Sequence, residues 1–361
     1  MDAKCWRVDS HVHLGRADEA GRLLEIAAAV GTERMGIACI PERNIIVANP
    51  AAFAAKAEHP DRFYVFGGLD HSHHWSGGRV KTPSLSEQVD LLRAIGCDGL
   101  KMLENKPATR KELDIPVDGP YFEPYFARVE ETGFPVVWHV ADPEEFWDPA
   151  LTPKWARDQG WGYDATYVKK EQLYVEIERV LARHPRLKIM FAHFYFLSAD
   201  LPRAAALLDR FAGVHLDLAP GIELLYNMSK DLPKARAFFT KYADRIVYGT
   251  DISGGNTLVE GRHRAGILQR WLETDEEYRV PPGVDFLLGP PEDGLMRGLK
   301  LPAEVVRKVC RGNYERLVGT KPRPLDRALA RKECERLAKC VEVLTGKKAA
   351  ENHAGKAAKC L

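Results

Sequence analysis

Short runs of apolar residues alternate with longer segments of mixed character along most of the chain. Eight runs are present, at residues 6–14, 35–40, 63–69, 99–103, 135–140, 187–193, 214–218 and 246–251. Most are followed by helix-like sequence; in residues 171–184, for example, apolar side chains recur at mixed spacings of three and four positions. Apolar runs separated by helices predict parallel strands that are buried on both faces of a sheet.

Eight such units favour an α/β protein whose strands close into a (β/α)8 TIM barrel. An open, doubly wound sheet is the alternative, but no G-x-G-x-x-G sequence follows the first run and no phosphate-binding P-loop sequence is present. Closure of a barrel requires its first and last strands to meet, so we expect residues 6–14 to pair with residues 246–251.

The end of the chain has a different pattern. After the prolines at positions 322 and 324, apolar residues form one helical stripe that ends at Gly346. We expect residues 1–320 to form the barrel. Residues 321–361 should add a C-terminal helix and a mobile, Ala/Lys-rich tail, packed on or beside the barrel.

Two segments are longer than ordinary connections. Residues 147–167 follow the fifth expected strand and are rich in Trp, Gly and Asp, and residues 283–299 follow the last one. Loops that follow the strands of a barrel lie on the face where active sites are built. Both segments are therefore candidate walls or lids of a substrate site.

Charge and composition narrow the classes of function. The 361 residues include 52 Lys and Arg against 51 Asp and Glu, a net charge of +1, which argues against nucleic acid as a partner. No stretch approaches the ~20 apolar residues of a membrane span, and residues 1–14 lack the apolar run of a signal peptide. The seven cysteines are scattered without a C-x-x-C pair, which indicates reduced thiols. We expect a cytoplasmic protein that acts on a small-molecule substrate, with no membrane partner; a homo-oligomer is compatible with this sequence.

Two histidines stand at the end of the first expected strand. Side chains alternate along a strand with a period of two, so His11 and His13 point the same way, while Val12 points to the opposite side. Two imidazoles side by side at a strand end can chelate one metal ion. Taken alone the pattern is weak, because pairs of buried histidines also occur as hydrogen-bonded core residues.

Three further polar residues close other expected strands. His139 lies in V-V-W-H-V, His193 in I-M-F-A-H and Asp251 in V-Y-G-T-D. Catalytic barrels draw their functional groups from the ends of several strands on one face, and a polar ring there is costly unless partners or ligands satisfy it. These positions predict a metal site in the barrel mouth.

Several motifs together resemble the amidohydrolase-2, or decarboxylase-like, branch of the amidohydrolase superfamily over residues 7–318. They are V-D-S-H-V-H-L at 8–14, W-H-V-A-D at 138–142, A-H-F at 192–194, Y-G-T-D at 248–251 and G-N-Y-E-R-L at 312–317. The resemblance implies one divalent metal, commonly zinc and sometimes manganese, bound by His11, His13, His139 and Asp251. It also implies that His193 lies near the metal and assists catalysis.

The resemblance implies a hydrolase mechanism. A bound divalent metal lowers the pKa of its water from 15.7 toward ~7 and polarises a carbonyl group. Asp251 would be the general base and would return the proton to the leaving group, and His193 would stabilise the oxyanion or share the acid role. The expected substrate is a small amide, lactone or cyclic ester.

Two alternatives stay open. The same branch includes non-oxidative decarboxylases and hydratases of small carboxylic acids, which use the same metal site and are not separated by these motifs. From another class, a catalytically silent metal-binding barrel would serve as a scaffold. Turnover of a model ester or lactone that is lost on chelation would distinguish an enzyme from a scaffold.

Lys101, in the fourth expected strand, has three interpretations. In some amidohydrolases a lysine at this place is carboxylated and bridges two metals, whereas in this branch it is more often an unmodified charge beside the substrate. We favour the second interpretation. The third is a lysine paired with Glu104 or Asp70 at the barrel mouth.

Three residues complete the candidate set. His71, in the D-H-S-H-H sequence after the third strand, is a candidate substrate contact or part of a solvated turn. Arg264 could hold a substrate carboxylate, or lie on an exposed helix. Asp142 could accept a hydrogen bond from a metal-binding imidazole, or cap the next segment.

Overall fold

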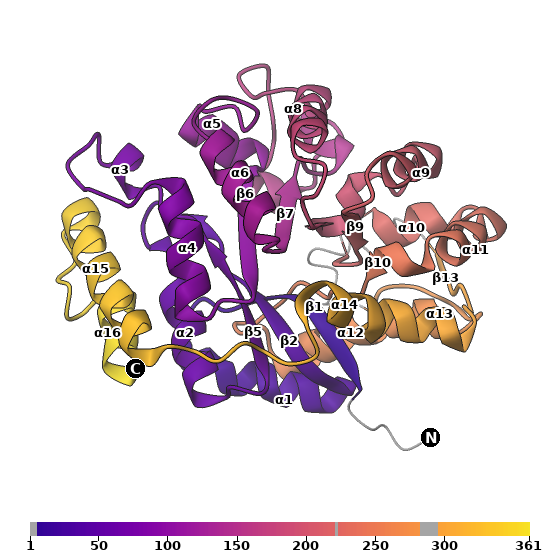
Figure 1. The fold of residues 1–361 in the computed structure, drawn as a ribbon. Coiled ribbons are helices and arrows are strands. Elements are labelled where there is room, and N and C mark those ends of the chain that lie inside the picture. The colour runs from indigo at the N-terminus through magenta and orange to yellow at the C-terminus, as the bar shows by residue number, and fades with distance from the viewer. Residues whose placement is uncertain (1–5, 221–222, 282–294) are drawn as a thin grey trace.

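A curled parallel sheet surrounded by helices is the main feature of the computed structural model, which describes residues 6–220, 223–281 and 295–361 (Figure 1). The strand order is β10-β9-β8-β7-β6-β5-β2-β1-β11. The strands are β1 Arg7–His13, β2 Thr32–Ala38, β5 Phe63–Gly68, β6 Gly99–Asn105, β7 Val136–Val140, β8 Ile189–Phe191, β9 Val214–Asp217, β10 Ile246–Val247 and β11 Ile252–Ser253. Every apolar run that we expected to be a strand overlaps one of them.

The sheet closes between β1 and the last strand segment. Strands β10 and β11 are consecutive pieces of one segment, so the nine strands occupy eight positions around the barrel. The backbone N–H of Ser10 donates to the carbonyl of Tyr248 at 2.9 Å, and that of Asp251 donates to the carbonyl of His11 at 2.8 Å. Val12 then pairs with Ile252 in β11. The expected TIM-barrel fold and its closure are confirmed.

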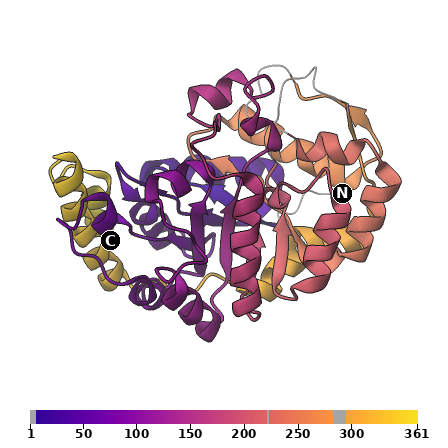
Figure 2. The ribbon, with the colours of Figure 1, turned by 90° about the horizontal axis from the view of Figure 1, so that it is seen from above.

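Helices between the strands cover the outside of the barrel (Figures 1 and 2). The longer ones are α1 Ala20–Val30, α2 Asn49–Glu58, α4 Leu85–Ile95, α6 Glu123–Thr132, α8 Lys170–Arg183, α9 Leu201–Arg210, α11 Leu232–Lys241 and α12 Leu258–Glu273. Shorter ones are α3 Ser72–Trp75, α5 Pro107–Leu113, α7 Lys154–Asp158, α10 Leu224–Ser229, α13 Ala303–Arg307 and α14 Asn313–Val318. Their ends follow ordinary capping rules: at α4, Ser84 and Glu87 form a capping box and Gly96 ends the helix with a φ of 102°.

One end of the barrel is closed by apolar packing. Tyr314 of α14 packs inside the barrel against Val8, Tyr64 and other side chains of one buried cluster. Beside it, the Asn313 amide donates to the carbonyls of Ala243 and Ile246, each at 2.7 Å. The G-N-Y-E-R-L sequence thus has a structural role at this end, which leaves the carboxyl ends of the strands for chemistry.

Two helices follow the barrel. Helix α15 (Arg327–Thr345) ends at Gly346, as the apolar stripe predicted. Where we expected a tail, the chain forms a further helix, α16 (His353–Cys360), which packs on α15 and α2 (Figure 1). Its Ala354 and Ala357 are buried, because small side chains let the helices approach closely. The division into a barrel and a C-terminal segment stays a prediction.

No helix in the described part of the chain is both long and apolar enough to cross a membrane.

Candidate metal centre

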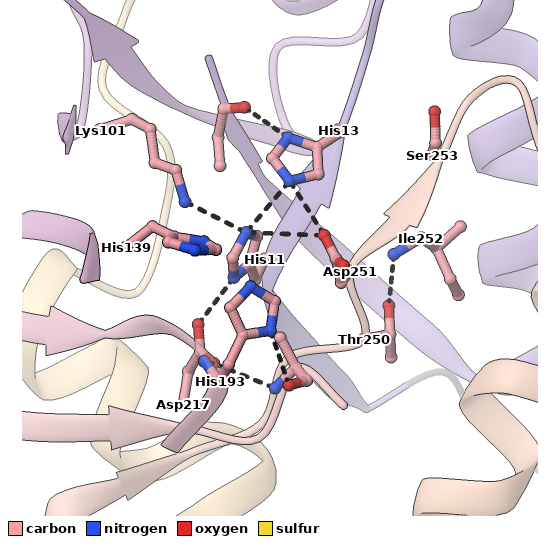
Figure 3. A network of polar contacts seen from close by, with 12 residues as sticks. His11, His13, Lys101, His139, His193, Asp217, Thr250, Asp251, Ile252 and Ser253 are labelled. Carbon is pink, nitrogen blue, oxygen red and sulfur yellow. Dashed lines mark hydrogen bonds and ion pairs between the residues drawn. The ribbon is translucent and has the colours of Figure 1, made fainter. Parts of the chain in front are cut away.

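Three side chains meet at the carboxyl ends of the strands (Figure 3). His11 and His13 come from β1, and Asp251 comes from the turn between β10 and β11. The two Nε2 atoms lie 3.2 Å apart, and Oδ1 of Asp251 lies 3.0 Å from Nε2 of His13 and 3.8 Å from Nε2 of His11. The period-two argument for the histidines is therefore confirmed.

Hydrogen bonds on the far side of each ring determine which nitrogen carries the proton. Nδ1 of His13 lies 2.8 Å from the carbonyl of Ala38, and because a carbonyl only accepts, Nδ1 donates and Nε2 keeps its lone pair. Nδ1 of His11 donates in the same way to Asp217 at 2.8 Å. Two lone pairs and a carboxylate oxygen therefore face one another.

A divalent cation fits this arrangement. These three ligand atoms lie within 4.8 Å of one another, and no other such group of His, Cys, Asp and Glu occurs among the described residues. Imidazole nitrogens and a carboxylate oxygen are ordinary ligands of zinc, with bonds of ~2.0–2.2 Å. The residues present fit one metal ion.

Electrostatics keep His11 and Asp251 in the metal-binding form. Burial, followed by the charge of Lys101, lowers the pKa of His11 well below its ordinary value. For Asp251, burial opposes ionisation, but the neighbouring charge of Arg264 helps to hold its pKa well below the ordinary value. At neutral pH the first is a neutral imidazole and the second a carboxylate.

Asp217, at the end of β9, was missed in the sequence. Besides accepting from His11, its carboxylate accepts the backbone N–H groups of His193 at 2.8 Å and Ala219 at 3.0 Å. Such a carboxylate orients an imidazole and fixes its tautomer. Its signal was the same one used for the other residues, a polar residue closing an apolar run, here in V-H-L-D.

Replacing Asp217 with asparagine should weaken metal binding by about 10–100-fold, because the imidazole of His11 loses its orienting carboxylate. Competition with a chelating dye measures this affinity. Asp209→Asn, which changes an exposed carboxylate in α9, is the matched control and should leave the affinity unchanged. Equal affinities for the two variants would show that Asp217 does not orient His11.

His139, the remaining predicted ligand, lies apart from these three. Its Nε2 is 2.9 Å from the carbonyl of Ala141 and 3.1 Å from Asp142, so Nε2 carries the proton and Nδ1 the lone pair. Burial lowers the pKa of His139 to about 4. The ring lines a cavity that opens at this end of the barrel, beside the three clustered side chains. Its metal-binding role stays a proposal.

His193 lies beside the three clustered side chains, in an unusual turn. The expected strand 187–193 ends early, at Phe191, and residues 193–196 all have positive φ values; that of His193 is 55°. Its ring centroid is 5.5 Å from that of His11. Nδ1 lies 3.1 Å from the carbonyl of Ala219, which leaves the lone pair on Nε2, and burial lowers the pKa of His193 to about 3. Left-handed backbone outside glycine is costly and concentrates at functional sites.

Lys101 reaches the same place from β6. Its Nζ lies 3.3 Å from Nε2 of His11, and the side chain is buried but lines the cavity. Burial lowers the pKa of Lys101 to about 8. The suggested pairing with Glu104 or Asp70 is wrong, because Glu104 bonds to His71 at 2.7 Å and Asp70 accepts from Arg336 at 2.8 Å.

The other two candidate substrate contacts, His71 and Arg264, do not line the cavity. His71 is fully buried against Glu104 and does not line the cavity, so neither a solvated turn nor a cavity contact describes it. Arg264 is buried rather than exposed on its helix, because it shares the inward face of α12 with Leu268. Its guanidinium donates to Oδ2 of Asp251 at 3.2 Å. Arg264 therefore binds a carboxylate of the protein itself, that of Asp251.

A cavity of about 540 Å³ opens above these residues. Its walls include the aromatic side chains Phe146, Trp155, Trp161 and Phe196. Residues 147–167 thus contribute Trp155 and Trp161 to a wall of this cavity, and their role as a substrate wall stays a prediction. Most of the segment 283–299 lies outside the described residues. The volume is in the range of small-molecule sites.

Comparisons with known proteins assign the chain to a family. The model of the family described as Amidohydrolase matches residues 8–320. A search of curated protein sequences found no significant match.

Solved structures share the fold at low identity. A 2,6-dihydroxybenzoate decarboxylase from Rhizobium is 17% identical, with a TM-score of 0.52 over 86% of this chain and 98% of that one. A probable 2-pyrone-4,6-dicarboxylic acid hydrolase from Acinetobacter baumannii, solved with citric acid, is 13% identical, with a TM-score of 0.51 over 87% and 99%. A 5-carboxyvanillate decarboxylase from Novosphingobium aromaticivorans, complexed with manganese and 4-hydroxy-3-methoxy-5-nitrobenzoic acid, is 14% identical, with a TM-score of 0.51 over 88% and 97%. At these identities the likeness supports the fold.

Proposed function

The chain belongs to the amidohydrolase family, and from that premise we propose that it is a metal-dependent hydrolase of a small amide, lactone or cyclic ester. The observation that carries the proposal is the convergence of two imidazole lone pairs and one carboxylate at the floor of a cavity. A catalytically silent scaffold has no need of the further groups that surround it, namely Lys101 and His193.

His11, His13 and Asp251 would hold the metal, with His139 completing the set through Nδ1. Zinc suits imidazole and carboxylate ligands, and manganese is the alternative that accompanies a similar decarboxylase. When bound, such an ion supplies Lewis acidity and makes water a nucleophile at neutral pH.

The protein's own groups would handle the proton. Asp251 would take it from the attacking water at a carboxylate oxygen and pass it to the leaving group, while Arg264 steadies Oδ2. The tautomer of His193 favours an accepting role for Nε2, rather than the donor role expected of an oxyanion stabiliser. Lys101 would donate to a negatively charged oxygen of the substrate.

The second candidate is non-oxidative decarboxylation of a small carboxylic acid. The observation that favours it is the pairing of aromatic cavity walls with Lys101, which suits a planar ring that carries a carboxylate. In that reaction Lys101 would hold the carboxylate, and Asp251 would take a proton from water and pass it to the carbon that loses carbon dioxide. The same residues thus serve either chemistry.

Metal analysis is the first test of the proposed function. The purified protein should contain close to one divalent ion per chain, because one group of ligands is found among the residues that the structure describes. Elemental analysis measures this content. Two tightly bound ions would instead point to a carboxylated Lys101 and would contradict a mononuclear site.

Turnover then separates the two reactions. The metal-loaded protein should hydrolyse members of a panel of lactones and aryl esters, and treatment with a chelator should abolish this activity. Release of acid measures the hydrolysis. Release of carbon dioxide from hydroxybenzoates, with the lactones untouched, would establish the decarboxylase. Turnover that persists after chelation would count against both proposed reactions. So would the absence of both hydrolysis and decarboxylation.

A further inference from the structure

Most of the aromatic wall of the cavity belongs to a segment with its own small core. Residues 143–168, which we name the cap, contain a buried cluster of Phe146, Ala156 and Tyr163 with partly buried tryptophans around it. The backbone N–H of Tyr163 donates to the carbonyl of Phe146 at 2.7 Å, which holds the two ends of the cluster together. The cap is therefore a compact unit that could move on the barrel as a whole.

One buried carboxylate joins the cap to the barrel. Asp142 accepts Nζ of Lys106 on both oxygens, at 2.8 and 2.7 Å, and the hydroxyl of Tyr163 on Oδ2. Nζ of Lys106 also lies 4.2 Å from the ring centroid of Trp161, close enough for a cation–π contact. The lysine thus contacts the carboxylate and the cap at the same time.

The same carboxylate reaches His139. Its Oδ1 is 3.1 Å from Nε2 of this histidine. A carboxylate has about four acceptor sites, and here they are taken by two contacts with Lys106, the hydroxyl of Tyr163 and the imidazole. Asp142 is only 3% exposed, which leaves these contacts as its means of stabilisation. Loss of one donor must disturb the others.

Other polar ties between the cap and the described part of the barrel lie at the surface. Lys111 contacts Thr166 and lies 3.8 Å from the ring centroid of Tyr167, and Lys170 pairs at 3.2 Å with Glu144, which is 77% exposed. Exposed pairs of this kind contribute little to holding a segment in place. The buried contacts of Asp142 are the stronger polar attachment.

We propose that Lys106, Asp142 and Tyr163 form a latch of positioning residues, which holds the aromatic cap over the cavity and, through the shared carboxylate, holds the ring of His139. Release of the cap then also frees the imidazole. The part that concerns His139 rests on the proposed function, whereas the attachment of the cap does not.

Limited proteolysis of the metal-free protein tests the attachment. Lys154 in the cap is 81% exposed, so trypsin can cleave there once the segment opens, and mass spectrometry identifies the first cuts. Tyr163→Phe removes the hydroxyl and keeps the ring, and cleavage within the cap should be about tenfold faster, since the rate follows the open population. Tyr167→Phe is the matched control, because its ring stays beside Lys111, and it should cleave like the unmodified protein.

A second pair of variants tests the charge. Lys106→Met should also speed cleavage within the cap. Lys106→Arg should keep the cap protected from trypsin, because a guanidinium can donate to both oxygens of Asp142. Thermal unfolding of each variant separates local opening from a general loss of stability. Equal cleavage within the cap for Tyr163→Phe and Tyr167→Phe, or no rescue by arginine, would overturn the latch.

Cobalt(II) provides the readout for His139. The visible spectrum of the cobalt-loaded protein should change in Tyr163→Phe and not in Tyr167→Phe. An opened cap with an unchanged spectrum would overturn the link to His139. If the unmodified protein takes up no cobalt, the proposed function fails together with that link, while the cleavage rates still decide whether the latch holds the cap.

Discussion

Replacement of Asp251 with asparagine should lower kcat by about 10²–10⁴, the usual contribution of a positioned acid–base group. An amide cannot take the proton of the attacking water at neutral pH, although it keeps the size of the side chain and one oxygen. Most of the metal should remain, because the imidazoles of His11 and His13 are untouched. Steady-state kinetics with whichever lactone, ester or carboxylic acid is turned over, together with metal analysis, measures both quantities.

A purely structural role for Asp251 makes a different prediction. If this carboxylate only helps to bind metal, saturating the variant with zinc or manganese should restore a near-normal rate. That recovery would exclude proton transfer by Asp251. The control is Asp244→Asn, which should leave kcat unchanged. Asp244 is an exposed residue that pairs with Lys308 on the surface.

Much of the fold could be predicted because the hydrophobic pattern of a barrel is local. Each strand is a short apolar run, and the pairing of the first and last strands follows from closure. The direction of His11 and His13 also followed from one local rule, the period of two along a strand. The place of His193 needed no more than the rule that strand ends share one face.

Several of the failures have a common physical cause, since they concern contacts between residues far apart in the chain. The tautomer of His13 depends on the carbonyl of Ala38, and that of His193 on the carbonyl of Ala219. The sequence left open an exposed position for Arg264, because a charged residue in a helix is usually solvated. In the structure Arg264 is buried, and Asp251 and nearby carbonyl groups accept its hydrogen bonds. No local pattern encodes such partners.

The second large effect is expected in the free energy of unfolding, at a buried ion pair away from the site. Lys56 is fully buried, and its Nζ lies 2.5 Å from Asp98, which also accepts the backbone N–H groups of Val65 and Arg323, each at 2.7 Å. Arg323 belongs to the segment that leads to α15, so this carboxylate joins the barrel to the C-terminal helices. Lys56→Met keeps the length of the side chain and leaves Asp98 without its cation.

The expected loss on Lys56→Met is about 3–5 kcal/mol, the usual result of removing one partner of a buried pair. Urea denaturation followed by both fluorescence and circular dichroism measures it. The matched control is Lys241→Met, whose pair with Asp209 is 3.2 Å long but mostly exposed, and which should change stability little. Equal losses would show that the bonds from Val65 and Arg323 suffice for Asp98. Coincident transitions by the two probes would show that the barrel and the C-terminal helices unfold together, whereas separate transitions would support a C-terminal segment that is a unit of its own.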